Sequence, residues 1–205
     1  MLNGGEARPH IYRMSSCLGE EKPSVEIDQD AALMLEVAGG SSEAFVELVR
    51  RYQDQLLNFF ARMGANMDGE DLVQETFLRI YRSRARYQPT ARFKTFLYVV
   101  ARHVWADHCR RVVRTERVAN WLQMDAAINA GAPGVLQPGQ TEDVQDLLNQ
   151  LSPKLREVIV LNLYQGLRYR EIAEVLGIPL GTVKSRINLA LNTLRSYLNG
   201  NGEKT

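Results

Sequence analysis

The sequence predicts an all-α protein made of two small helical domains joined by a flexible linker. Along most of the chain, apolar residues recur at steps of three and four, which is the spacing of an amphipathic helix. Gly or Pro interrupts each helical stretch, and one long interruption separates the two halves of the chain. It contains Gly131, Pro133, Gly134, Pro138 and Gly139. With 205 residues and 45% hydrophobic content, the chain can bury two small cores.

The same patterns give predicted bounds for each segment. Residues 1–28 are polar and aperiodic and are expected to form a mobile N-terminal extension. Residues 29–117 form the first helical domain and residues 118–140 the linker. Residues 141–199 form a second domain of four helices, and residues 200–205 a tail.

Three helices are predicted in the first part of the first domain. The first covers about 30–37, and the second begins after a cap at Ser41 or Ser42 and ends at Gly64. The third begins near Asp68, and its buried side is expected to be Leu72, Val73, Phe77 and Ile80. Its outward edge is then Asp71, Gln74, Glu75 and Arg79. Such a carboxylate-bearing edge is either solvated surface or a docking face for a basic partner.

A fourth helix, predicted from residue 91 or 92 to about 114, mixes cations with aromatic residues. Its predicted outward side carries Lys94, Thr95, Tyr98, Arg102, His103, Trp105, Arg110 and Arg111. This mixture suits a single nucleic-acid strand, because the charges follow the phosphates while aromatic faces stack on unpaired bases. In the alternative interpretation, Phe93, Phe96 and Trp105 belong to the core and the arginines are solvated surface. The residues of this segment alone do not decide between the two.

The second domain is predicted to end in a helix-turn-helix between Leu167 and Leu198. Gly177 can end the first helix at positive φ, and Pro179 prevents simple continuation into the second. The apolar positions of the second helix are Val183, Ile187, Ala190, Leu191 and Leu194. A polar edge is left free to face a DNA groove: Thr182, Lys184, Ser185, Arg186 and Asn188. The alternative is a plain helical hairpin.

Two shorter helices are predicted ahead of this motif and give it a small core to pack on. Ser152 is expected to cap the second of them, with Pro153 in its first turn. Its inward residues are expected to be Leu155, Val158, Ile159 and Leu163, up to an end at Gly166.

The formal net charge of +1 hides an uneven distribution. Residues 20–75 hold thirteen acidic and four basic residues, whereas residues 79–117 hold eleven basic and two acidic ones. Residues 118–151 contain no Lys or Arg. One face of the protein is therefore expected to attract phosphate and another a basic partner.

Residue spacing excludes several kinds of site. His103, His108 and Cys109 do not converge on one tetrahedral centre from a single helix, so no metal site and no cofactor is predicted. No catalytic arrangement of Ser, His and Asp and no phosphate-cradling Gly-rich loop is found, so the chain does not read as an enzyme. Cys17 and Cys109 are too few for a disulfide scaffold, and no apolar run approaches the roughly 20 residues of a membrane span. A cytoplasmic protein without membrane insertion is expected.

Short motifs follow one another in a specific order along the chain. They are Glu43-Ala44-Phe45, Asp71-Leu72-Val73-Gln74-Glu75-Thr76-Phe77, Phe93-Lys94-Thr95-Phe96-Leu97-Tyr98 with Ala101-Arg102 and Asp107, Leu151-Ser152-Pro153, Gly166-Leu167, Glu171-Ile172-Ala173 and Gly181-Thr182-Val183-Lys184-Ser185-Arg186. In this combination the chain resembles the bacterial sigma-70 family of initiation factors, and within it the short extracytoplasmic-function (ECF) group. The resemblance covers about residues 30–198.

The resemblance implies a sigma factor that binds core RNA polymerase and directs it to promoters, with catalysis left to the polymerase. The third helix would dock on the clamp helices of the largest polymerase subunit through Asp71, Leu72, Gln74, Glu75, Phe77, Leu78 and Arg79. The fourth helix and the loop before it would recognise and open the minus-ten element through Arg92, Phe93, Lys94, Thr95, Phe96, Tyr98, Arg102, His103, Trp105, Arg110 and Arg111.

For the second domain, the resemblance implies contact with the minus-thirty-five element and with the polymerase flap. The implied DNA contacts are Arg168, Arg170, Thr182, Lys184, Ser185, Arg186 and Asn188. An anti-sigma partner that covers these faces is also implied. The alternative function is a helix-turn-helix transcriptional regulator that has no sigma role.

The chain departs from the family pattern at several positions. Phe96 and His103 stand where the family commonly has Trp and Asn, which puts its minus-ten preference in doubt. Asn162, Leu189 and Leu191 are uncharged where members often carry Arg. Because a bidentate contact from Arg to guanine is worth roughly 1 to 3 kcal/mol of discrimination, the upstream element should differ from the usual one or be read less sharply.

Overall fold

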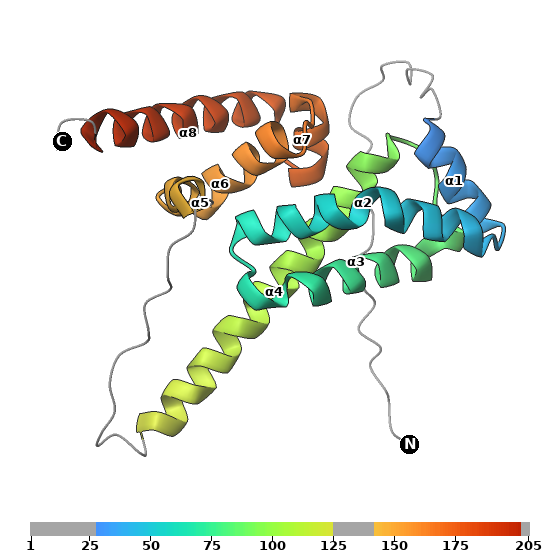
Figure 1. Ribbon diagram of the computed structural model, residues 1–205, viewed down its shortest axis with the longest axis horizontal. Coiled ribbons are helices and arrows are strands. Elements are labelled where there is room, and N and C mark those ends of the chain that lie inside the picture. Colours follow the sequence, from blue (N-terminus) through green and yellow to red (C-terminus); the bar gives the residue numbers. More distant parts are fainter. Residues whose placement is uncertain (1–27, 125–141, 202–205) are drawn as a thin grey trace.

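The computed structural model describes residues 28–124 and 142–201, and all regular structure within these ranges is helical (Figure 1). The all-α prediction is confirmed. The predictions for residues 1–27, 125–141 and 202–205, which include nearly all of the extension and most of the linker, lie outside the described residues.

The first domain is a bundle of α1 (Gln29–Ala38), α2 (Ser42–Met63), α3 (Gly69–Ser83) and α4 (Phe93–Met124). Two short 3₁₀ turns, η1 (Asn66–Asp68) and η2 (Arg84–Arg86), flank α3. Side-chain caps begin the first two helices: Ala31 N donates to Asp28 Oδ1 at 2.7 Å, and Ala44 N donates to Ser41 Oγ at 3.2 Å. Gly64 ends α2 at a φ of 100°, a conformation that a residue with a side chain rarely adopts.

The core of this domain lies where α2 and α3 pack together and α4 crosses them (Figure 1). Its largest fully buried side chains include Phe59, Phe60, Phe93 and Tyr98. Phe59 meets Tyr98 with 5.4 Å between ring centroids, and Phe93 meets Tyr52 at the same separation. Aromatic pairs at such separations hold the helices in one arrangement.

Helix α4 is longer than the sequence predicted. It extends to Met124, past the domain boundary predicted at residue 117, and its last turns project beyond the bundle in Figure 1. The first part of the predicted linker is thus helical.

The second domain contains α5 (Glu142–Asn149), α6 (Pro153–Ile159), a π-helical segment η3 (Val160–Tyr164), α7 (Tyr169–Leu176) and α8 (Leu180–Asn201). Helices α7 and α8 form the predicted helix-turn-helix, because Gly177 ends α7 at a φ of 63° and α8 begins directly after Pro179. Ile172, Val183 and Ile187 are buried in the angle between these two helices. Pro153 occupies the first turn of α6, as predicted, while the Ser152 side chain makes no capping hydrogen bond.

The π-helical segment corrects one prediction. Leu163, which was expected to face inward, is 59% exposed, whereas Val160 and Leu161 are buried. A π turn takes up one more residue than an α turn, so the residues that follow it are rotated around the helix axis. The regular three- and four-residue spacing therefore fails at this point.

Candidate functional site

The outward edge of α3 divides into exposed and buried residues. Asp71, Gln74 and Leu78 are exposed, and the Leu78 side chain is accessible over 41% of its surface. Leu72 and Phe77, which the resemblance implied as polymerase contacts, are instead buried in the domain core. They position the edge rather than form its surface.

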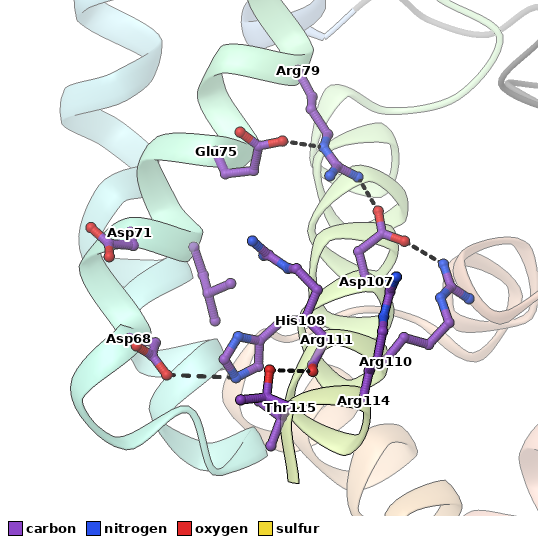
Figure 2. A pocket seen from close by; sticks show the side chains of 12 residues that line it. Asp68, Asp71, Glu75, Arg79, Asp107, His108, Arg110, Arg111, Arg114 and Thr115 are labelled. Carbon is purple, nitrogen blue, oxygen red and sulfur yellow. Dashed lines mark hydrogen bonds and ion pairs between the residues drawn. The ribbon is translucent and has the colours of Figure 1, made fainter. Parts of the chain in front are cut away.

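A chain of ion pairs ties α3 to α4 (Figure 2). Arg79 binds Glu75 of its own helix and Asp107 of α4, with both nitrogen–oxygen distances at 2.7 Å. Asp107 also accepts a hydrogen bond from Arg110. Burial alone would raise the pKa of Asp107, but the hydrogen bonds from Arg79 and Arg110 hold it below its usual value. Glu75 and Arg79 are thus committed to a contact between helices.

A cleft of about 840 Å³ lies between α3 and the exposed part of α4. Figure 2 shows Asp68, Asp71 and Glu75 on the α3 side of it and arginines on the α4 side. These arginines are Arg110, Arg111 and Arg114. His108 lies at 3.7 Å from Asp68 and stacks on Trp105.

The aromatic residues at the start of α4 belong largely to the core. Phe93, Thr95 and Tyr98, which were predicted to contact DNA, are buried in this conformation. Phe96 and Trp105 are half-buried, and Phe96 packs against Tyr87 with 5.1 Å between ring centroids. The outward side predicted for this helix is therefore wrong at Thr95 and Tyr98, and the alternative interpretation, in which Phe93 belongs to the core, is confirmed for that residue.

The second domain covers the same part of α4. Tyr98 donates a hydrogen bond to Gln165, and both side chains are buried. Arg102 Nε lies 3.0 Å from a Glu157 carboxylate oxygen, and Arg92 lies 3.7 Å from Glu171. In this conformation the predicted minus-ten contacts Arg92, Tyr98 and Arg102 are thus occupied by the other domain.

Burial shifts the pKa of two charged groups that lie beside this interface. Burial raises the pKa of Glu157 above its usual value, although the neighbouring Arg102 acts in the opposite direction. Burial lowers the pKa of Lys94, while the carboxylates of Glu171 and Asp30 oppose that change. In both groups the largest cause is desolvation, which disfavours the charged form.

Contacts from α2 extend the interface. The Arg62 guanidinium lies over the Tyr164 ring at 3.7 Å from its centroid. Arg156 NH1 donates to the Met63 carbonyl of α2 at 3.4 Å, while its Nε donates to the Leu148 carbonyl of its own domain at 2.9 Å.

The remaining α4 residues of the predicted DNA face are open. His103, Arg110 and Arg111 are exposed, and the last two lie beside the cleft between α3 and α4. This part of the predicted surface is free to meet a partner without any change in the arrangement of the domains.

The predicted DNA edge of the helix-turn-helix lies on the surface. Arg168, Arg170, Lys184, Ser185 and Asn188 are exposed. Thr182 and Arg186 are half-buried at the margin of the same surface. The Arg168 amide donates to Glu171 at 2.7 Å and so fixes the start of α7. This arrangement resembles a groove-reading surface more than a plain hairpin.

The three uncharged residues that depart from the family pattern, Asn162, Leu189 and Leu191, lie in different surroundings. Asn162 is half-buried, and its Nδ2 donates to the Leu167 carbonyl at 3.0 Å, which holds the turn between η3 and α7. Leu191, predicted as an apolar inward position, is 39% exposed, and Leu189 is 57% exposed. Only Ala190 between them is buried.

Sequence reasoning missed the residues by which the second domain contacts the first. None of Glu157, Gln165 and Glu171 was predicted to contact the first domain, and Glu171 was named only within a family motif. Glu157 adjoins the apolar pair Val158 and Ile159. A carboxylate next to buried residues is a usable signal for a polar interface, but the sequence does not name its partner.

Two kinds of feature are absent from the part of the chain that the structure describes. No group of three or more His, Cys, Asp or Glu side chains there is placed to hold a metal ion. None of the helices in residues 28–124 and 142–201 is long and apolar enough to cross a membrane.

Comparison with known proteins identifies the two domains. Residues 48–115 match the family description Sigma-70 region 2, and residues 141–194 match Sigma-70 region 4. CarQ of Myxococcus xanthus is 34% identical over 161 residues, which are 78% of this chain and 91% of CarQ. SigW of Bacillus subtilis is 31% identical over 174 residues, which are 80% of this chain and 93% of SigW. The chain belongs to the ECF group of the sigma-70 family.

The chain is also similar to one longer relative and to two solved structures. SigE of Mycolicibacterium smegmatis is 34% identical over 163 residues, and these span 63% of SigE. CnrH, solved in complex with the cytosolic domain of CnrY, shares 27% identity at a TM-score of 0.65. That match covers 84% of this chain and 99% of CnrH. RpoE from Bartonella quintana, solved with the anti-sigma factor NepR, has the same fold at a TM-score of 0.61 and 24% identity.

The sigma factor therefore acts in transcription initiation and binds promoter elements through regions 2 and 4. The region 2 match runs from within α2 to within α4, and the region 4 match covers α5 to most of α8; the first and second domains are called region 2 and region 4 from here on. Sigma factors are not enzymes, so the side chains described above act by binding alone.

Proposed function

We propose that this sigma factor docks on core RNA polymerase through the outward edge of α3. The observation that carries the proposal is the exposure of Asp71, Gln74 and Leu78 on one side of α3, while Arg79 ties that helix to α4. Because this ion pair holds α3 against α4, the exposed edge of α3 keeps one orientation. Acidic, amide and apolar groups together fit a basic partner helix, such as the clamp helices of the largest polymerase subunit.

In this proposal the DNA contacts are divided between α4 and α8. The exposed Lys184, Ser185 and Asn188 support contact with the minus-thirty-five element, and Arg168 and Arg170 support phosphate contacts. The start of α4 meets the minus-ten strand only after region 4 has moved away, because Glu157 and Glu171 occupy its arginines. Polymerase docking thus comes first, separation of the regions second, and strand opening third.

The remaining partners follow from the family. Region 4 also contacts the polymerase flap, and an anti-sigma factor holds the protein inactive, as NepR is an anti-sigma factor for RpoE. The protein acts in the bacterial cytoplasm, where its polymerase and promoters are found. Its exposed polymerase and promoter faces are the surfaces that such an inhibitor would have to cover.

The test combines core binding with promoter-dependent run-off transcription. Asp71→Arg places a cation on the docking edge and is expected to weaken binding to core polymerase about tenfold or more. Asp54→Arg makes the same charge change at an exposed position on α2 and should leave binding unchanged. Glu75 is a poorer target because its substitution also breaks the pair with Arg79.

Two outcomes would contradict the proposal. One is equal core binding by the Asp71→Arg and Asp54→Arg variants. The other is the absence of a promoter-dependent transcript from every start site mapped after expression of the protein in its host.

A further inference from the structure

Leu189 is an apolar side chain in the middle of a polar surface. It follows Ser185 by one helical turn and Thr182 by two, so the three residues lie on one side of α8. Leu189 is 57% exposed, while its neighbour Ala190 is completely buried. The side chain is therefore mostly exposed and does not belong to the buried core of region 4.

The surroundings of Leu189 indicate what covers it. Between Leu180 and Leu198 the chain carries Lys184, Arg186 and Arg195 and no Asp or Glu. Arg186, three residues before Leu189, lies on the same side of α8, and Lys184 lies across its exposed side; a helix with this net positive charge attracts a polyanion. The hydroxyl of Thr193 donates to the Leu189 carbonyl at 2.9 Å, so the polar group of residue 189 is already bonded and only the apolar side chain remains to make contact.

On the major-groove edge of unmodified DNA, the only methyl group is the C5 methyl of thymine, because cytosine carries just a hydrogen at that carbon. The polar groups on that edge are hydrogen-bond donors and acceptors, for which a leucine has no partner. We propose that Leu189 makes apolar contact with a thymine methyl in the minus-thirty-five element and thereby specifies that base pair. The inference rests on the proposed placement of α8 in the major groove.

The contact explains how region 4 can be selective without an arginine at this position. Arginine would select guanine through its O6 and N7 atoms, whereas leucine favours thymine by burying its methyl group. Burial of a single methyl group corresponds to about a fourfold change in affinity. The upstream element should therefore show a moderate preference for one thymine, on either strand.

The test removes the methyl group and leaves everything else in the DNA unchanged. Each thymine of the mapped minus-thirty-five element is replaced in turn by deoxyuridine, on each strand, and open-complex formation by the holoenzyme is measured. One replacement is expected to lower promoter affinity about fourfold with the unaltered protein. The same replacement should have no effect with Leu189→Ala.

Leu198→Ala is the matched control. Leu198 is 59% exposed on the same helix, two and a half turns further along, and its substitution should leave the deoxyuridine effect intact. Both substitutions are at exposed positions and introduce the best helix former, and circular dichroism checks that each variant is folded.

The outcomes separate this inference from the proposed function. The inference is overturned if the element has no thymine, if no deoxyuridine weakens the unaltered protein, or if the penalty persists in Leu189→Ala. An effect of Leu189→Ala that is equal on all templates would assign the side chain to a protein contact instead, which also overturns it. If the unmodified promoter gives no transcript, the proposed function fails, and the inference fails with it.

Discussion

The two working faces of region 2 differ in what lies over them. The edge of α3 is open, and Asp71, Gln74 and Leu78 are exposed on it. The start of α4 is covered by region 4, which occupies Arg92, Tyr98 and Arg102. In this conformation the edge that we propose for polymerase docking is accessible, whereas part of the face that we propose for strand opening is not.

The largest expected effect comes from reversing the charge of Glu157. Glu157→Arg places a cation against Arg102 at the interface between the regions. Breaking a fully buried pair costs about 3 to 5 kcal/mol, and because the Arg102 side chain is 35% exposed we expect about 2 kcal/mol here. The radius of gyration measured by small-angle X-ray scattering should rise, and binding to single-stranded minus-ten DNA should strengthen.

Glu174→Arg provides the control for that experiment. It makes the same charge change on an exposed residue of α7 and should leave the radius of gyration unaltered. Equal radii for the unaltered protein and Glu157→Arg would mean that this ion pair does not hold the regions together.

Removing the Tyr98 hydroxyl should also destabilise the closed arrangement of the two regions, but by less than Glu157→Arg does. Tyr98→Phe keeps the ring against Phe59 and leaves the buried Gln165 side chain without its hydroxyl donor. The loss of one such hydrogen bond costs about 1 kcal/mol. The fraction of closed molecules, measured by fluorescence energy transfer between dyes on the two regions, should fall. A lower melting temperature with unchanged transfer would instead make this bond a feature of region 2 stability.

Arg111→Ala and Arg102→Ala compare two arginines of α4, one open to solvent and one bound by region 4. Arg111 is exposed, whereas Arg102 is engaged by Glu157. For binding of the full chain to single-stranded minus-ten DNA, Arg111→Ala should flatten the salt dependence by about 0.7 in the log–log slope. Arg102→Ala should leave the slope nearly unchanged. Equal slopes for the two variants would mean that both side chains are available to DNA.

Acidity should shift the closed fraction slightly, in a direction set by Glu157. Burial raises the pKa of this carboxyl in the closed form, so protonation favours closure. The closed fraction should be highest below the ordinary glutamate range and decline as pH rises through the raised value. Energy transfer measured against pH tests this, and Glu157→Gln should remove the pH dependence. A dependence that survives in Glu157→Gln would belong to another group.

Much of the fold was predictable because each helix carries local start and end signals. Ser41, Gly64 and Gly177 act within a few residues of themselves, so their roles are visible in the sequence. The end of α4 was harder, because residues 118–124 carry no Lys or Arg and lie next to a segment rich in Gly and Pro. The absence of Lys and Arg and the nearby Gly and Pro residues therefore predict a linker in a segment that is still helical.

The site was predictable only where exposure follows from position on a helix. Asp71 and Lys184 lie opposite an apolar stripe, and both are exposed. Arg102 also lies opposite a stripe, yet it is engaged by Glu157, and Tyr98 is buried both against Phe59 of its own domain and by Gln165. Glu157 and Gln165 come much later in the chain. A contact between regions depends on three-dimensional packing that no periodicity encodes.

The π-helical segment Val160–Tyr164 determines how Tyr164 and Gln165 are rotated around the helix axis. Loss of a single residue there would let α6 continue as an ordinary α-helix and turn Tyr164 and Gln165 by about 100° away from their partners in region 2. Because Gly166 begins a new turn, the helix-turn-helix beyond it would keep its own structure. Loss of one residue from this segment would thus separate the two regions without altering the helix-turn-helix itself.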